Sequence, residues 1–195
     1  MHDNSGFRQD GFYQPGEIHP PPSQSIWKEL AGWVKDILLA VVIAVLMVVF
    51  LYQPVKVEGT SMQPQLDDQE RIFVNKFIYR FGEIRRGDVV VFYYPKDPSK
   101  SFIKRVVGLP GETVGIRHGR VYINGKLLEE PYVLSHFQDA DSYPSVEIKE
   151  GQYYMLGDHR NASNDSRSWG VVPRENIFGK AVFCYWPIEK AGFIQ

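Results

Sequence analysis

The hydrophobic positions of the chain follow two different patterns. Residues 37–52 form an uncharged apolar run. Extended back to Trp33, the run has about 20 residues, the length of an α-helix that crosses a bilayer. Trp33 and Tyr52 stand at its two ends, where aromatic rings favour the membrane–water interface. A core helix would normally carry a polar stripe, and a cleavable signal peptide would have a shorter leader and a small-residue cleavage site. The run therefore predicts a permanent anchor helix over residues 27–52.

Residues 53–195 show short apolar or alternating segments separated by turn signals. Asn124-Gly125 is the sequence of a type I′ hairpin turn, residues 109–112 form a Pro-Gly turn, and residues 172–177 are compatible with one helical turn. The segments are rich in Val, Ile, Phe and Tyr and predict strands at 71–77, 88–95, 102–108, 113–117, 120–125, 153–157 and 180–186. We expect a mainly β fold, an antiparallel barrel-like sheet domain that follows one N-terminal transmembrane helix.

Composition limits the class of protein. The 195 residues suffice for an anchor and one modest domain, and residues 1–26 are rich in Gly, Pro, Gln and Ser, which predicts a disordered tail. Hydrophobic content of 44%, charged content of 23% and a net charge of −1 argue against general disorder and against nucleic acid as a partner. Cys184, the only cysteine, lies in an apolar run and is expected in the core. The polar segment 157–165 lacks the ligand spacing of an EF-hand loop, and we expect neither a metal nor a cofactor.

One lysine has an unusual sequence environment. The chain's histidines lie in the tail or in separate polar turns, so a Ser-His-Asp arrangement is not indicated. A lysine can also deprotonate a serine, provided that apolar burial keeps its amine neutral. Lys104 stands in "SFIKRVVG" among apolar neighbours. By itself, such a lysine would more often extend from a strand edge into solvent.

Three motifs give Lys104 a context. They are "GTSMQPQL" at 59–66, "KRVVGLPGE" at 104–112 and "GDHRNASNDSRSWG" at 157–170, in this order after one apolar span. Together they resemble the type I signal peptidases (leader peptidases), which are membrane-anchored Ser-Lys proteases. The resemblance covers roughly residues 27–187. It implies an endopeptidase that removes N-terminal signal peptides with Ala-x-Ala sites from translocated precursor proteins.

The resemblance assigns roles to individual residues. It implies that Ser61 is the nucleophile, that Lys104 is the general base, and that Ser163 hydrogen-bonds and orients this lysine. It further implies a structural support of charged residues, in which Arg105 pairs with Asp158, and a shallow apolar substrate pocket. The support comprises Arg105, Asp158, Asp165 and Arg167, and the pocket comprises Val55, Val57, Leu66, Phe102 and Ile103.

The chain departs from the family pattern at some positions. His159 replaces the usual asparagine of Gly-Asp-Asn-Arg. Gly59 stands where some members have a serine, whose hydroxyl donates a hydrogen bond to the oxyanion. Besides the backbone N–H of Ser61, the second donor is left open between another loop amide, a water and the Thr60 hydroxyl.

Orientation in the membrane does not follow from charge. Lys28 and Lys35 flank one side of the apolar run, and Lys56 and Arg71 lie near the other, so the positive charges are nearly balanced. The resemblance implies a cytoplasmic N-terminus and an extracytoplasmic catalytic domain, in a cell membrane or a thylakoid membrane. We expect a monomer whose partners are the lipid bilayer and precursor proteins.

Two rival functions remain to be compared. Self-cleaving repressors share a related Ser-Lys core, but they need a DNA-binding head, and the tail of this chain is too short and too weakly basic for one. A catalytically silent, membrane-tethered β domain that binds partners has no chemical need for Ser61, Lys104 and Ser163 together.

Overall fold

The computed structural model describes residues 26–195, without the side chains of residues 48 and 49. The predicted disordered tail lies outside the described residues, apart from Ile26. Helix α1, Ile26–Leu51, is continuous, and its segment Ile26–Met47 is long and apolar enough to cross a membrane. None of that segment is buried against protein. A core helix would bury an apolar face, so α1 has the surface of a helix that lies in lipid, as a membrane anchor requires.

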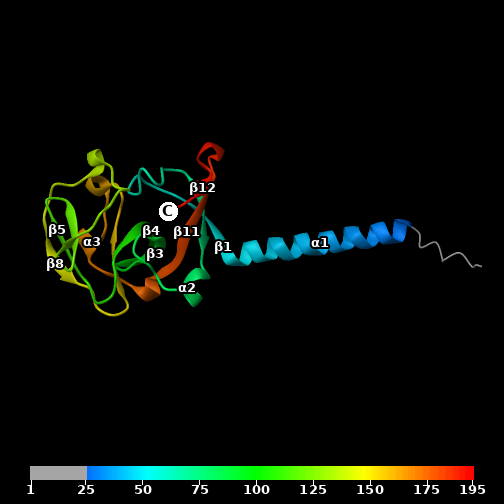
Figure 1. Cartoon of the computed structure of the whole chain (residues 1–195), viewed down its shortest axis with the longest axis horizontal. Helices are drawn as coiled ribbons and strands as arrows, with labels where there is room; N and C mark the ends of the chain where they lie inside the picture. Colours follow the sequence, from blue (N-terminus) through cyan, green and yellow to red (C-terminus); the bar gives the residue numbers. More distant parts are fainter. Residues whose placement is uncertain (1–25) are drawn as a thin grey trace, which may run out of the picture. The chain divides into compact units, whose positions relative to one another are not determined.

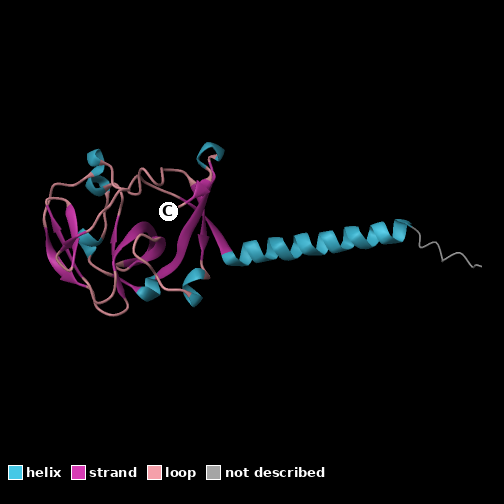
Figure 2. Ribbon diagram, viewed as in Figure 1, coloured by secondary structure: helices cyan, strands magenta, loops and turns pink. Residues whose placement is uncertain are grey.

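The rest of the chain forms two antiparallel sheets (Figures 1 and 2). The larger has the strand order β1-β2-β11-β3-β4-β9-β10, with β12 paired to β11, and the smaller has the order β7-β6-β5-β8. The strands of the larger sheet are β1 Tyr52–Lys56, β2 Arg71–Asn75, β3 Val89–Tyr94, β4 Asp97–Gly108, β9 Gln152–Leu156, β10 Val172–Pro173, β11 Ile177–Trp186 and β12 Gly192–Phe193. Those of the smaller sheet are β5 Thr113–Arg117, β6 Arg120–Ile123, β7 Lys126–Leu127 and β8 Tyr143–Glu147.

Short helical segments connect the strands. Helix α3, Ser166–Trp169, begins after Asp165, whose carboxylate accepts a hydrogen bond from the Arg167 backbone N–H. The other segments are α2 Ile78–Phe81, η1 Ser135–Phe137, η2 Arg160–Ala162, η3 Arg174–Asn176 and η4 Ile188–Lys190. The turn η3 lies within residues 172–177, for which the sequence allows one helical turn.

The mainly β, antiparallel fold is confirmed, and all the predicted strands are present. The larger sheet is open, because its described pairings end at β1 and β10, so "barrel-like" holds only loosely. Positive φ angles of 50° at Asn124 and 79° at Gly125 confirm the I′ hairpin between β6 and β7. The longest strands that the sequence pattern missed, β1 and β8, are edge strands that contain proline. An edge strand tolerates proline because one side of it needs no ladder N–H.

The strands next to the site are buried on both faces. In β3, Val89 and Val91 belong to one apolar cluster, and Val90 and Phe92 belong to another on the opposite face. This explains the continuous apolar sequence of β3, since a strand covered on both sides has no polar face. Cys184 is 4% exposed and belongs to the first cluster, as expected. The neighbouring strand β4 is exposed in its first half and buried from Lys104 to Gly108, where it joins this packed interior.

Gly108, at the end of β4, provides a test of this packing. A Cβ at Gly108 would overlap Ile148 Cδ1 and Val114 Cγ2 in the cluster beneath the smaller sheet. Gly108→Ala should lower the free energy of unfolding by about 1–3 kcal/mol, as overpacked cores do. Thermal and denaturant unfolding of the detergent-solubilised chain measures the effect. Gly192→Ala is the control, because its nearest neighbour, Lys190 O, lies 4.0 Å away. Equal stability of the two variants would contradict this description of the core.

Candidate active site

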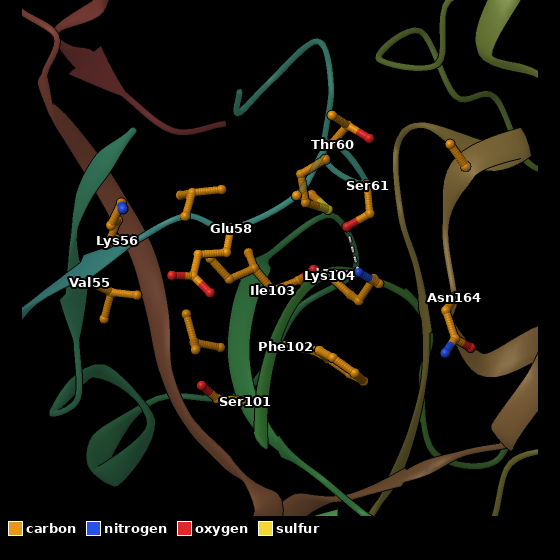
Figure 3. Close-up of a pocket in the computed structure, with 15 residues that line it drawn as sticks. Val55, Lys56, Glu58, Thr60, Ser61, Ser101, Phe102, Ile103, Lys104 and Asn164 are labelled. Carbon is orange, nitrogen blue, oxygen red and sulfur yellow. Dashed lines mark hydrogen bonds between the residues drawn. The ribbon is translucent and has the colours of Figure 1, made fainter. Parts of the chain in front are cut away.

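Ser61 and Lys104 lie side by side although they are distant in sequence (Figure 3). Ser61 stands in the turn that follows β1, and Lys104 projects from β4. Lys104 Nζ donates a hydrogen bond of 2.6 Å to Ser61 Oγ, and it lies 3.0 Å from the carbonyl oxygen of Ile103. The geometry is that of a hydroxyl nucleophile beside an amine base.

The sheet buries the Lys104 amine. Lys104 pairs with Val90 of β3, and β9 adjoins β4 on its other side. The residue is only 4% exposed, and its Nζ lies 5.6 Å from the ring centre of Phe102. Burial in these surroundings lowers the pKa of Lys104 to about 8, although the negative charges of Asp165 and Asp158 act in the opposite direction. A substantial fraction of the amine is therefore neutral near that pH.

The turn that carries Ser61 is held by apolar packing and by hydrogen bonds. Met62 is 2% exposed and Leu66 is fully buried, and both belong to the apolar cluster beneath the turn. Gly59 has a φ of 93°, a conformation that favours glycine, and its N–H donates to Asp68 Oδ1 at 2.7 Å. The carbonyl of Ser61 accepts a hydrogen bond of 3.1 Å from the backbone N–H of His159. Ser61 is therefore fixed in a defined backbone conformation.

A groove of about 490 Å³ leads to Ser61 (Figure 3). The predicted pocket residues that line it are Val55, Val57, Phe102 and Ile103. Leu66 was also expected there; it is fully buried in the apolar cluster beneath the turn and does not line the groove in this structure, so its pocket role stays a prediction. Other residues that line the groove were not predicted, because they belong to no recognised pocket pattern in the sequence: Lys56, Glu58, Val91, Ser101, Ala162 and Asn164.

Buried ion pairs surround the dyad. Arg105, next to Lys104 on β4, donates two hydrogen bonds to Asp158, of 2.8 and 2.7 Å, so the expected pairing is present. Their side chains are 3% and 0% exposed. Arg105 also donates to the backbone carbonyls of Gly87 and Gln195, both through Nη1. Because each charge has its counter-charge, the pair fixes residues 157–170 to β4 without an isolated buried ion.

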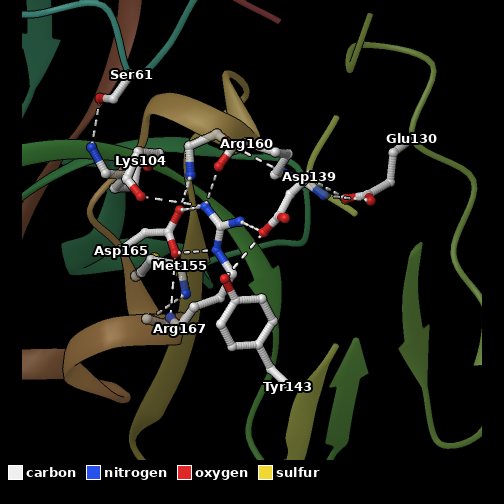
Figure 4. Close-up of polar contacts among 12 residues, drawn as sticks. Ser61, Lys104, Glu130, Asp139, Tyr143, Met155, Arg160, Asp165 and Arg167 are labelled. Atoms are coloured by element: carbon white, nitrogen blue, oxygen red, sulfur yellow. Dashed lines mark hydrogen bonds and ion pairs between the residues drawn. The ribbon is translucent and has the colours of Figure 1, made fainter. Parts of the chain in front are cut away.

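A second charged cluster holds the segment after Asp158 (Figure 4). Arg167 donates from Nε and Nη2 to the two oxygens of Asp165, at 2.8 and 2.7 Å. Asp165 also accepts the N–H of Gly157, at 3.1 Å. The sequence did not indicate two further acids, Asp139, bound by Arg167, and Glu130, bound by buried Arg160. Neither acid belongs to a motif, so only the folded chain brings them to these arginines.

Ser163 lies beside the dyad without the expected bond. A Cβ on Gly157 would overlap both Ser163 Oγ and the carbonyl oxygen of Ser61, so these groups converge on one glycine. The Ser163 hydroxyl is buried and has no hydrogen-bond partner among the described residues. Its bond to Lys104 is therefore not formed in this structure, and its orienting role stays a prediction.

Metal chemistry has no visible basis in the part of the chain that the structure describes. Within residues 26–195, no group of three or more His, Cys, Asp or Glu residues is arranged to hold a metal ion.

Comparison with known proteins relates the chain to one family. The family model described as "Signal peptidase, peptidase S26" matches residues 30–186. The chain is 42% identical over 166 residues to a signal peptidase I of Leptolyngbya laminosa, which is 82% of this chain and 81% of that protein. It is 38% identical over 170 residues to a signal peptidase I of Bacillus licheniformis, at coverages of 83% and 91%. A crystal structure of a signal peptidase I from Enterococcus faecalis V583 aligns with 51% of this chain and 97% of that chain, with 32% sequence identity and a TM-score of 0.46.

The buried Arg105–Asp158 pair makes a prediction about stability. Asp158→Asn would leave the Arg105 guanidinium without its counter-charge, and breaking a buried pair in this way typically costs about 3–5 kcal/mol. Denaturant unfolding measures the loss. The control is Asp97→Asn, which breaks the exposed pair with Lys100 and should leave stability nearly unchanged. An Asp158→Asn protein as stable as this control would show that the pair does not hold the segment.

Proposed function

Because the chain belongs to the signal peptidase family, peptidase S26, we propose that it is a membrane-bound serine endopeptidase that removes N-terminal signal peptides from precursor proteins. The observation that carries the proposal is the 2.6 Å hydrogen bond between Lys104 Nζ and Ser61 Oγ at the end of an accessible groove. A hydroxyl next to a largely desolvated amine is a nucleophile with its own base. The family membership does not favour a repressor-like protease or a silent binding domain.

The proposed reaction is acyl transfer. The neutral amine of Lys104 accepts the proton of Ser61 Oγ, and this oxygen attacks the scissile carbonyl. The tetrahedral intermediate collapses when the peptide nitrogen takes the proton from Lys104 and leaves as an amine. The remaining acyl-enzyme reacts with water, whose proton passes to Lys104, and the released Ser61 hydroxyl regains a proton from the same amine. The dyad is thereby restored, with no net change in its protons.

The groove supports a preference for small residues before the cut. The side chains of Val55, Val57 and Ile103 form an apolar part of its lining, and Phe102 lies beside Lys104. An extended peptide directs alternate side chains to the same face, so the first and third residues before the scissile bond would face this apolar part together. Ala-x-Ala sites suit such a shallow apolar surface.

Ser163 and the ion pairs have supporting roles in the proposal. The Ser163 hydroxyl is buried next to Gly157 and has no partner within residues 26–195; a hydrogen bond to Lys104 would satisfy it and would orient the amine. Arg105, Asp158, Asp165 and Arg167 hold residues 157–170 in place and take no part in proton transfer, because their charges are already paired with one another.

The proposed topology has three parts: a cytoplasmic tail at residues 1–26, an anchor at 27–52 and an extracytoplasmic catalytic domain at 53–195. Its support is the single unburied apolar helix and the short connection to Ser61. About ten residues of extended chain reach at most ~35 Å, so the nucleophile would stay near the bilayer surface, where translocated precursors emerge. Proteolysis of sealed vesicles of known orientation tests this topology, and cleavage of the domain from the cytoplasmic face would contradict it.

A monomer is sufficient for this function. Ser61 and Lys104 come from the same chain, and so do the residues that line the groove. The proposed partners are therefore the lipid bilayer, of a cell membrane or a thylakoid membrane, and the precursor proteins.

The dyad predicts a specific pattern of inactive variants. Ser61→Ala and Lys104→Ala should each lower kcat/KM by at least about three orders of magnitude, and the double variant should be no worse, because the two residues act as a unit. Lys104→Arg should also fail, since a guanidinium stays protonated. The assay uses the detergent-solubilised full chain and an Ala-x-Ala signal-peptide substrate. The matched control is Lys100→Arg on the exposed part of β4, which should keep full activity. Turnover by Lys104→Arg would exclude the proposed base.

The Lys104 pKa predicts the pH dependence of cleavage. Apolar burial favours the neutral amine, so the base form predominates above a pH of about 8 and the charged, inactive form predominates below it. Well below that pH, kcat/KM should fall about tenfold per pH unit, because one proton blocks the base. The measurement is a kcat/KM profile on one peptide, with unfolding checked at each pH. A profile that stays flat as the pH falls through this value would contradict the assignment of Lys104 as the base.

A further inference from the structure

Within residues 26–195, the peptide group between Thr60 and Ser61 makes hydrogen bonds through its carbonyl oxygen but not through its N–H. This bond is not among the cis peptides of the described chain, so its C=O and N–H point in opposite directions. The carbonyl oxygen of Thr60 accepts two hydrogen bonds, from the Gln63 N–H at 3.1 Å and from His159 Nδ1 at 3.2 Å. Both lone pairs of this oxygen are therefore used. In contrast, the Ser61 N–H on the opposite side has no hydrogen-bond partner among residues 26–195.

His159 is well placed to fix this peptide. A carbonyl oxygen only accepts hydrogen bonds, so Nδ1 of the imidazole must carry the proton in this contact. The backbone N–H of His159 donates to the next carbonyl, that of Ser61, at 3.1 Å. The imidazole ring packs against Phe137 in a tilted arrangement, with ring centres 4.0 Å apart. One residue thus binds two consecutive carbonyls of the nucleophile turn and is itself supported by an aromatic ring.

The oxyanion site of this chain has few other donors. Gly59 has no hydroxyl, and its backbone N–H is already donated to Asp68 Oδ1. Thr60 and Ser61 both line the groove in which the scissile carbonyl would lie (Figure 3). The N–H of Ser61, which has no partner among residues 26–195, is therefore a backbone donor available next to the nucleophile.

We propose that His159 is a positioning residue for the oxyanion donor: by holding the carbonyl of Thr60, it sets the plane of the Thr60–Ser61 peptide and aims the Ser61 N–H at the attacked carbonyl oxygen. The same bond polarises the peptide, since hydrogen bonds in a chain strengthen one another. Because the oxyanion exists only in the transition state and the intermediate, His159 should affect kcat much more than substrate binding. This inference rests on the proposed peptidase function.

A packing role for His159 makes the opposite prediction, and two variants separate the roles. His159→Phe keeps an aromatic ring on Phe137 but removes the Nδ1–H donor. His159→Asn removes the ring, but its Nδ2–H lies one bond beyond Cγ, as Nδ1 does in histidine, so the donor to Thr60 is kept. The matched control is His136→Phe, the same substitution at an exposed histidine whose ring also packs against Phe137, with ring centres 4.2 Å apart.

The experiment measures kcat and KM on one signal-peptide substrate, and the affinity for a peptide aldehyde, which forms a tetrahedral adduct with an oxyanion. All variants are full-length and detergent-solubilised. Loss of one oxyanion donor typically lowers rates ~10²–10³-fold, so misaiming it in His159→Phe should lower kcat about tenfold. KM should change less than about twofold, and aldehyde binding should weaken by the same factor as kcat. His159→Asn and His136→Phe should stay near wild type, and the acid limb of the pH profile should keep its midpoint in every variant.

Each other result overturns the inference. Wild-type kcat in His159→Phe, or equal losses in the Phe and Asn variants, would show that the donor to Thr60 does not matter for the reaction. A shifted acid limb would place the effect on Lys104 instead of the oxyanion. If wild type and Ser61→Ala cleave at the same rate, the proposed function fails and this inference fails with it. If Ser61→Ala is inactive but the His159→Phe and His159→Asn variants do not behave as expected, the inference about His159 fails while the proposed function stands.

Discussion

The structure depends on the desolvation of one amine. In water, the Lys104 side chain would be protonated at neutral pH and could not take a proton from Ser61. The sheet removes it from water: β4 has neighbouring strands on both sides, apolar clusters cover both of its faces, and Lys104 is left 4% exposed. Its pKa falls to about 8 as a result. For the proposed reaction, the central position of β4 is therefore a chemical requirement as well as a feature of the packing.

Charged residues lie close to Lys104, and because they are paired with one another, the burial of its amine can still lower its pKa. Asp165 and Asp158 raise the pKa of Lys104, whereas Arg167 lowers it. Because Asp158 is bound by Arg105 and Asp165 by Arg167, neither carboxylate is free to hold the Lys104 amine in its charged form. The pairs also fix residues 157–170, which bring Ser163 and the backbone N–H of His159 to the nucleophile turn. The same two ion pairs thus neutralise the charges near Lys104 and position residues 157–170.

The nucleophile turn shows how a short exposed segment can be rigid. Met62 and Leu66 anchor it in the core, Asp68 binds the Gly59 N–H, and His159 binds the carbonyl of Ser61. Such anchoring lowers the entropy that would be lost on reaching the reactive geometry. The groove beside the turn stays open, and its lining combines apolar side chains such as Val55 and Ile103 with polar ones such as Glu58.

The sequence by itself determined the features that are encoded locally. An apolar run without a polar stripe indicated α1, alternating segments indicated most strands, and Asn124-Gly125 indicated a hairpin. Three motifs identified Ser61 and Lys104, but their 2.6 Å contact was visible only in the fold. Tertiary structure alone decided that Leu66 packs inward, that Glu130 binds Arg160, and that the proline-containing edge strands β1 and β8 join the sheets. These contacts depend on strand register and on residues far apart in the chain, and a local pattern of hydrophobic and polar positions carries no information about which distant partner a side chain meets.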